Sequence, residues 1–367
     1  MIFKLVLYAL LLFFLNLALV HYGLAQANQY KVSSQKPTDE EAERISTEEI
    51  KLNVTVKNDF GHFDPSLLPQ DLMVVENSTP HTIESLRHVP ASVLVVLDTG
   101  GELRLAKGLG TTRAAALELI KSLSDETSLA LMQYSDKAEI LTEWTTDKSQ
   151  MIESLLTKTN FGKRSKFIEA MNLAAKFLNN RPNENRHLVL ITDGTDSSSN
   201  FEERRAALKN LVAANVSVHI LSYTALEQKE NAGRSAAVKP GGTRPPSAPP
   251  FIFEGQTFPI LTVNLDREMI RAIRQRQLDL LNSQKELEEL AKETGGVIFL
   301  PTDLKDMPAE AREIAGTIDS QYVLTYIPKR PLADSAPGEV RNIGVVPRRV
   351  GLIVEARRKF IVPAKQN

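Results

Sequence analysis

The chain has 367 residues, enough for about two domains of ordinary size, and its 42% hydrophobic and 24% charged content is typical of globular proteins. The net charge of −1 shows no excess of basic residues that would attract nucleic acid, so no partner of that class is expected. The absence of cysteine excludes a disulfide framework and thiolate metal sites.

The first 27 residues have the pattern of a targeting segment. Lys4 precedes an apolar run at 5–20, and an Ala-x-Ala cleavage pattern follows at 25–27. We therefore expect export to the periplasm, the cell envelope or the medium, with cleavage favoured. The stretch 2–20 is close to the ~20 residues that span a bilayer, so an uncleaved segment would associate the protein with a membrane.

Short strands are expected after a polar spacer at 28–47. Residues 50–56 alternate apolar and polar side chains, which is typical of a half-buried strand. Further strands are expected at 72–75 and 81–86. Together they predict an N-terminal β segment over 48–90.

Residues 91–225 alternate strands and helices. The apolar runs 91–97 and 187–192 predict strands that are buried on both faces, with helices at apolar spacing of about 3.6 residues between them. Residues 127–134 and 138–144 instead predict a hairpin. This alternation is typical of a doubly wound, mostly parallel α/β sheet.

A segment at 225–266 interrupts the pattern. Its Pro- and Gly-rich part, 239–250, cannot form a helix or a central strand, so it is either a disordered loop or a functional arm. The motif at 283–286 resembles a capping box that begins a helix, which Gly295 ends. A run of arginines just before it is interpreted as a solvated helix face, with anionic lipid or an acidic partner as the alternative; these are Arg267, Arg271, Arg274 and Arg276.

The chain returns to short strands near its end. A C-terminal β segment is expected over 321–362. We expect it to pair with 48–90, because each segment alone has too few strands to bury a core.

Both buried strands end in an acidic residue. Asp98 closes the first run, and Asp193 follows the second. In parallel sheets the ligand crevice lies beyond the carboxyl ends of the strands. Asp98 and Asp193 are therefore candidates for a cation or ligand site.

This constellation resembles a von Willebrand factor type A domain, expected over 91–320. The resemblance is carried by the strand pattern with Asp98, by Thr192-Asp193-Gly194 and by Ser165, which opens a helix between them. The flanking stretches 72–76 and 321–328 resemble exported bacterial proteins of the type A domain-related group, best known in Acidobacteria.

The resemblance implies a metal-ion-dependent adhesion site. In that family an Asp-x-Ser-x-Ser loop, a threonine from a second loop and an aspartate from a third surround Mg²⁺ or Mn²⁺, and a partner carboxylate completes the octahedron. Asp98 matches the first aspartate, Ser165 the threonine and Asp193 the third-loop aspartate. Gly100 and Glu102 stand where the two serines are expected.

These departures leave two interpretations of the site open. Glu102 is either a direct metal ligand, together with Asp98, Ser165 and Asp193, or a solvated residue in the first turn of a helix. Lys163 or Arg164 could neutralise the carboxylates without any ion, and a degenerate, metal-free site is favoured.

The sequence thus favours an exported, non-enzymatic protein-binding, adhesion or assembly module that acts through the C-terminal edge of the sheet. The expected partner is a protein, and no organic cofactor is expected. One alternative is a metal-independent envelope scaffold that uses the same domain. A less favoured one is a divalent-metal-dependent hydrolase with Asp98 and Asp193 as an acid/base pair.

Overall fold

The computed structural model describes most of the chain after the predicted spacer. The predicted targeting segment, the spacer and Glu102 lie outside the described residues, as does the Pro-rich part of the insertion. No helix among the described residues is long and apolar enough to cross a bilayer. The described residues are 48–64, 66–101, 108–181, 184–198, 200–237, 252–253, 256–257 and 265–363.

A six-stranded sheet forms the centre of the α/β part, in the order β12-β9-β8-β5-β6-β7. Neighbouring strands are parallel except β6 and β7, which form the predicted antiparallel hairpin. The doubly wound, mostly parallel sheet is therefore confirmed. Its strands are β5 (Ser92–Asp98), β6 (Ser128–Tyr134), β7 (Ala138–Thr145), β8 (Arg186–Thr192), β9 (Ser217–Ser222) and β12 (Ile298–Phe299).

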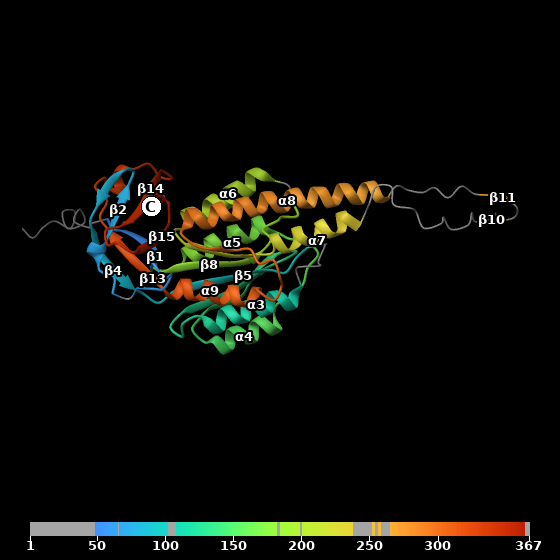
Figure 1. The fold of residues 1–367 in the computed structure, drawn as a ribbon, viewed down its shortest axis with the longest axis horizontal. Helices are drawn as coiled ribbons and strands as arrows, with labels where there is room; N and C mark the ends of the chain where they lie inside the picture. Colours follow the sequence, from blue (N-terminus) through green and yellow to red (C-terminus); the bar gives the residue numbers. More distant parts are fainter. Residues whose placement is uncertain are drawn as a thin grey trace, which may run out of the picture. The chain divides into compact units, whose positions relative to one another are not determined.

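Helices cover both faces of this sheet (Figure 1). Successive side chains of a strand point to opposite faces, so Leu94 and Val96 of β5 pack in one core, and Val93, Val95 and Leu97 pack in the other. The first core is closed by α5 (Phe167–Asn179), α6 (Phe201–Ala213) and α8 (Leu265–Thr294), and the second by α3 (Leu109–Ser122), α4 (Lys148–Thr157) and α9 (Met307–Asp319).

Helices occupy both ends of the predicted insertion. α7 (Thr224–Ala237) begins directly after β9, where an irregular segment was expected, and the two-residue strands β10 (Ile252–Phe253) and β11 (Gln256–Thr257) pair with each other. The prediction that a helix begins at Ser283 is wrong, because Ser283 lies inside α8 with its side chain buried. Gly295, at φ +74°, follows the end of α8 as predicted.

Strands from both ends of the described chain form a β module of two antiparallel sheets, ordered β15-β1-β13-β4 and β16-β14-β2-β3. β1 lies between two C-terminal strands, so the N- and C-terminal flanks complete one core, as predicted. The strands are β1 (Ile50–Asn58), β2 (Leu72–Glu76), β3 (Thr79–His81), β4 (Ile83–His88), β13 (Gln321–Tyr326), β14 (Val340–Pro347), β15 (Leu352–Ala356) and β16 (Lys359–Ile361).

A buried ion pair lies within this module. Nη1 of Arg341 donates to Oε1 of Glu76 at 2.6 Å, and the hydroxyl of Tyr326 donates to the other carboxylate oxygen at 2.8 Å. The pair joins β14 to β2, and the tyrosine adds β13 from the opposite sheet. Because a buried charge is costly without its partner, this network ties the two sheets into one arrangement.

A pair of buried histidines lies between β8 and β9. Nδ1 of His187 is 3.0 Å from Nε2 of His219, and Nε2 of His187 is 2.7 Å from Oδ1 of Asn185. Burial lowers the pKa of His219 to about 3, and burial with the neighbouring His219 lowers that of His187 well below its usual value. Both rings are therefore neutral at neutral pH.

Acidification should destabilise the fold through these histidines. In the unfolded chain they take up protons near pH 6.5, whereas the folded chain resists protonation, so their stabilisation is complete above that pH and is lost below it. For His219 the loss at pH 5 is about 2 kcal/mol. Urea unfolding at pH 7.5 and pH 5 should show a smaller acid-side loss in His219→Gln than in the wild type. His62→Gln, at an exposed position, serves as the control, and equal losses in all three proteins would contradict the prediction.

Candidate functional site

The two predicted carboxylates lie at the same edge of the six-stranded sheet. Asp98 is the last residue of β5, and Asp193 directly follows β8, the parallel neighbour of β5. Ser165 lies in the loop just before α5. Parallel strands bring their carboxyl ends to one edge, so these segments, which are distant in sequence, meet there.

Asp98 is fully buried and firmly held. Its carboxylate accepts hydrogen bonds from the backbone amide of Gly100 at 3.2 Å and from the hydroxyl of Thr192 at 3.1 Å. The Oγ of Ser165 lies 3.4 Å from the same carboxylate and 3.1 Å from the carbonyl oxygen of Thr195. Asp98 and Ser165, which the sequence pointed to, are therefore in direct contact.

Asp193 is also buried, with 1% of its surface exposed. Its Oδ1 accepts from the backbone amide and the hydroxyl of Thr195, both at 2.7 Å. Its Oδ2 accepts from Nη2 of Arg276 at 3.0 Å, and its carbonyl oxygen accepts from the hydroxyl of Ser283 at 2.6 Å. The last two donors belong to α8, so this helix is fastened to the loop after β8.

Arg276 is the site residue that the sequence interpretation misplaced. The expected solvated face holds for Arg274, which is exposed, but is wrong for Arg276, whose side chain is 22% exposed. Its guanidinium lies between Asp193 and Glu227, with Nη2 2.5 Å from the Glu227 carboxylate. Burial alone would lower the pKa of Arg276, but the charges of the two carboxylates outweigh that effect and raise it. The guanidinium therefore keeps its charge.

The periodicity of the helix is the sequence signal that could have shown that Arg276 lies on the packed side of α8. Residues two positions apart on a helix lie about 200° apart, so Arg276 faces away from Arg274. It shares a side of α8 with Ile273, Leu280 and Ser283, all of which are buried.

The loop before Ser165 closes over Gly100. The backbone amides of Lys163 and Arg164 donate to the carboxylate of Asp136 at 3.2 and 3.0 Å, while their side chains are exposed. A Cβ on Gly100 would lie 1.8 Å from the carbonyl oxygen of Arg164. The position therefore has no room for the serine that the resemblance implies. The charge beside Asp193 comes from Arg276 rather than from Lys163 or Arg164.

Two buried tyrosines lie behind the carboxylates. The hydroxyl of Tyr134 is 2.6 Å from Oγ1 of Thr192, and that of Tyr223 is 2.6 Å from Oγ1 of Thr112. Burial raises the pKa of both phenols, and the nearby carboxylates raise it further. Both tyrosines therefore remain neutral hydrogen-bonding groups.

The described residues do not fit the octahedral oxygen set that the resemblance implies. Gly100 supplies no side-chain oxygen, and Asp193 faces a guanidinium. Among the residues that the structure describes, no group of three or more histidines and carboxylates is placed to hold a metal ion. Glu102, the fourth predicted ligand, lies outside them.

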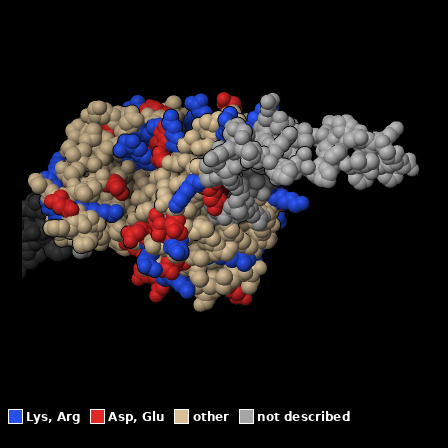
Figure 2. All heavy atoms as spheres, turned by 45° about the vertical axis from the view of Figure 1, so that its right-hand side comes forward, with Lys and Arg blue, Asp and Glu red and all other residues tan. Residues whose placement is uncertain are grey.

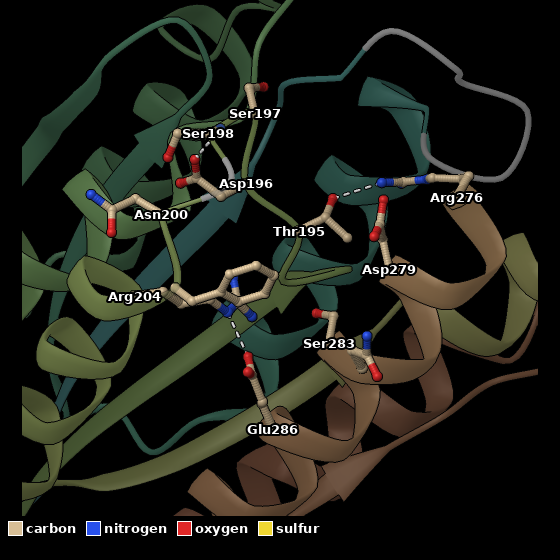
Figure 3. A pocket seen from close by; sticks show the side chains of 12 residues that line it. Thr195, Asp196, Ser197, Ser198, Asn200, Arg204, Arg276, Asp279, Ser283 and Glu286 are labelled. Atoms are coloured by element: carbon tan, nitrogen blue, oxygen red, sulfur yellow. Dashed lines mark hydrogen bonds and ion pairs between the residues drawn. The ribbon is translucent and has the colours of Figure 1, made fainter. Parts of the chain in front are cut away.

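A hollow of about 290 Å³ opens beside Thr195 and Arg276, two of the residues that contact Asp193 (Figure 3). Its walls come from the loop after β8, the start of α6 and the middle of α8. Arg204 crosses it, donating to the carbonyl oxygen of Gly194 at 2.7 Å and pairing with Glu286 at 2.5 Å. Most of its other lining groups are polar, among them Asp196, Ser198, Asn200, Asp279 and Asn282.

The crowding at Gly100 gives a direct test of why the expected serine is absent. Gly100→Ser should lower the melting temperature by several degrees, because overpacking costs about 1–3 kcal/mol when backbone must move. Gly110→Ser is the matched control, since a Cβ there meets nothing within 4 Å. A Gly100→Ser variant that melts like the wild type would show that the loop containing Arg164 can move to accommodate the side chain without loss of stability.

The matched part of the sequence covers the strands that carry the site. Residues 93–195 match the sequence profile of the von Willebrand factor type A domain. No curated protein matches the chain.

Several solved structures are similar to this chain at low sequence identity. An aerotolerance-related membrane protein from Bacteroides fragilis NCTC 9343 is 17% identical, with a TM-score of 0.38 over 62% of this chain and 98% of that one. A von Willebrand factor type A protein from Catenulispora acidiphila is 10% identical, with a TM-score of 0.42 over 86% and 74%. Manganese-loaded TRAP protein from Plasmodium vivax is 17% identical, with a TM-score of 0.32 over 48% and 61%.

The family profile, rather than these structures, carries the assignment. It begins within β5 and ends just beyond Asp193, so it includes both carboxylates and the strands that hold them. The chain therefore contains a von Willebrand factor type A domain, matched over residues 93–195.

Proposed function

We propose that this protein is an exported, non-enzymatic module that binds a protein partner at the carboxyl edge of its type A domain sheet. The hollow beside Asp193 and Arg276 carries the proposal, because it gives this edge a concave surface. Phe201, 73% exposed, stands at the hollow among hydroxyl, amide and carboxylate groups. An exposed aromatic side chain surrounded by adaptable polar groups suits protein–protein contact.

The burial of the carboxylates favours binding over catalysis. Asp98 and Asp193 are 0% and 1% exposed, and both accept hydrogen bonds from neighbouring groups. A general acid or base must reach the proton that it transfers, so these two residues are poorly placed for the hydrolase alternative.

The surface charge also favours a protein partner. On the face shown in Figure 2, acidic and basic side chains are interspersed over the residues drawn in colour. A polyanion partner would favour a continuous basic surface instead. Export is proposed from the sequence of residues 1–27 alone, and cell fractionation would test it.

The lack of fit to an octahedral ligand set favours the metal-independent form of this module over the metal-assisted one. Asp98, Ser165 and Asp193 then serve to shape the edge, rather than to present an ion to the partner. Their hydrogen bonds hold the loops after β5 and β8 and the loop before α5 together.

Two single-residue variants, one at the proposed binding edge and one control, test this surface. The chain would be immobilised and used to capture partners from an envelope extract, and Phe201→Ala should reduce capture about tenfold or more, because a central aromatic contact is commonly worth that much. Phe60→Ala is the matched control, since Phe60 is 84% exposed but belongs to the β module. A partner that both variants retain equally would place the binding surface elsewhere.

A further inference from the structure

Three buried carboxylates gather at the carboxyl edge of the sheet. Asp98, Asp193 and Glu227 are 0%, 1% and 4% exposed. Carboxylates so far from water are costly unless a cation or hydrogen bonds compensate them. In the type A family a divalent ion is expected in this role, but the described residues do not fit one.

Arg276 provides a positive charge at this edge. Nη2 of its guanidinium reaches Oδ2 of Asp193 at 3.0 Å and Oε2 of Glu227 at 2.5 Å, Nε reaches the same Glu227 oxygen at 3.2 Å, and Nη1 donates to the hydroxyl of Thr195 at 2.8 Å. A planar guanidinium offers several donors in a fixed arrangement, so it can satisfy acceptors from different directions as a metal ion does.

The acceptors around Arg276 come from separate elements. Asp193 and Thr195 belong to the loop after β8, Glu227 to α7 and Arg276 itself to α8. The guanidinium therefore joins the site loop to α7 and α8, the helices at the two ends of the predicted insertion. The hydroxyl of Ser283, about two turns further along α8, strengthens the same junction by donating to the Asp193 carbonyl oxygen.

We propose that Arg276 is a tethered cation that takes the place of the divalent ion at this edge of the type A domain. The edge then keeps its shape without Mg²⁺ or Mn²⁺. If a partner binds at this edge, as proposed above, its binding should be independent of divalent ions; this one consequence rests on the proposed function.

Removal of the guanidinium should expose an oxygen-lined space. Asp193, Glu227 and Thr195 each direct an oxygen at it. Mg²⁺ and Mn²⁺ bind one or two carboxylates while keeping several waters, so a hydrated ion has suitable ligands there once the side chain is shortened to alanine. A salt bridge to a single surface carboxylate would leave too few oxygen ligands for such an ion to stabilise the fold.

Thermal unfolding of the full chain tests the proposal, with each protein measured in EDTA and in excess Mg²⁺ or Mn²⁺. The wild-type melting temperature should agree within about 1 °C between the conditions, because an ion that does not bind the native state cannot stabilise it. Arg276→Ala should melt about 6 °C or more lower in EDTA, and Mn²⁺ should restore part of the loss. Arg274→Ala, on the exposed face of the same helix, is the matched control and should melt like the wild type.

Several results would overturn the proposal. One is a wild-type stabilisation by metal that Asp98→Asn abolishes. Another is an Arg276→Ala variant that melts like Arg274→Ala, or one that is destabilised but does not respond to Mn²⁺. If Arg276→Ala does not fold, Arg276→Lys is measured instead. A melting temperature below that of the wild type would support a requirement for the several planar donors of a guanidinium. An unchanged melting temperature would contradict it.

Partner capture in EDTA separates this inference from the proposed function. Equal capture with and without EDTA supports an ion-independent edge, and a partner lost in EDTA contradicts it. If Phe201→Ala and Phe60→Ala capture equally, the proposed binding edge fails, while the melting experiments still decide the role of Arg276.

Discussion

The arrangement of the α/β part depends on how buried negative charge is compensated at the ends of β5 and β8. Parallel strands bring Asp98 and Asp193 to one edge, where packed loops and helices exclude water from both. Two hydroxyls and a backbone amide hold the first carboxylate, and a guanidinium, a hydroxyl and an amide hold the second. The guanidinium contributes a contact that holds α8 beside the loop after β8, in addition to the apolar packing of this helix in the first core.

Close backbone packing at Gly100 complements this electrostatic arrangement. The carbonyl oxygen of Arg164 occupies the space that a side chain at residue 100 would need. The loop is held in that position by the carboxylate of Asp136, which accepts from two successive backbone amides. Among the described residues, steric closure on one side and Arg276 on the other leave a polar surface at this edge, which supports the proposed role in protein contact.

The β module explains how the chain accommodates an α/β domain between its two flanks. β4 and β13 are neighbours, and His88 pairs with Tyr322, so the chain leaves and re-enters the module at adjacent positions. The imidazole of His88 also lies 2.6 Å from the carbonyl oxygen of Asp319 at the end of α9. The α/β segment is thus inserted without disturbing the pairing of β1 with β13, and the buried Glu76–Arg341 pair specifies how the two flanks meet.

The fold class could be predicted from the pattern of apolar residues, because burial on one or both faces of an element sets their period. The sequence also predicted that Asp98 and Asp193 share an edge, since parallel strands end together, whereas Ser165 was indicated only by the resemblance to the type A family. The crowding at Gly100 and the carboxylate partners of Arg276 could be seen only in the folded structure. Both depend on contacts between segments far apart in the chain: the Arg164 carbonyl against Gly100, and α8 against the loop after β8. By charge Arg276 resembles its exposed neighbour Arg274, but it lies on the packed side of α8, where its half-buried guanidinium is stabilised by carboxylates from other elements.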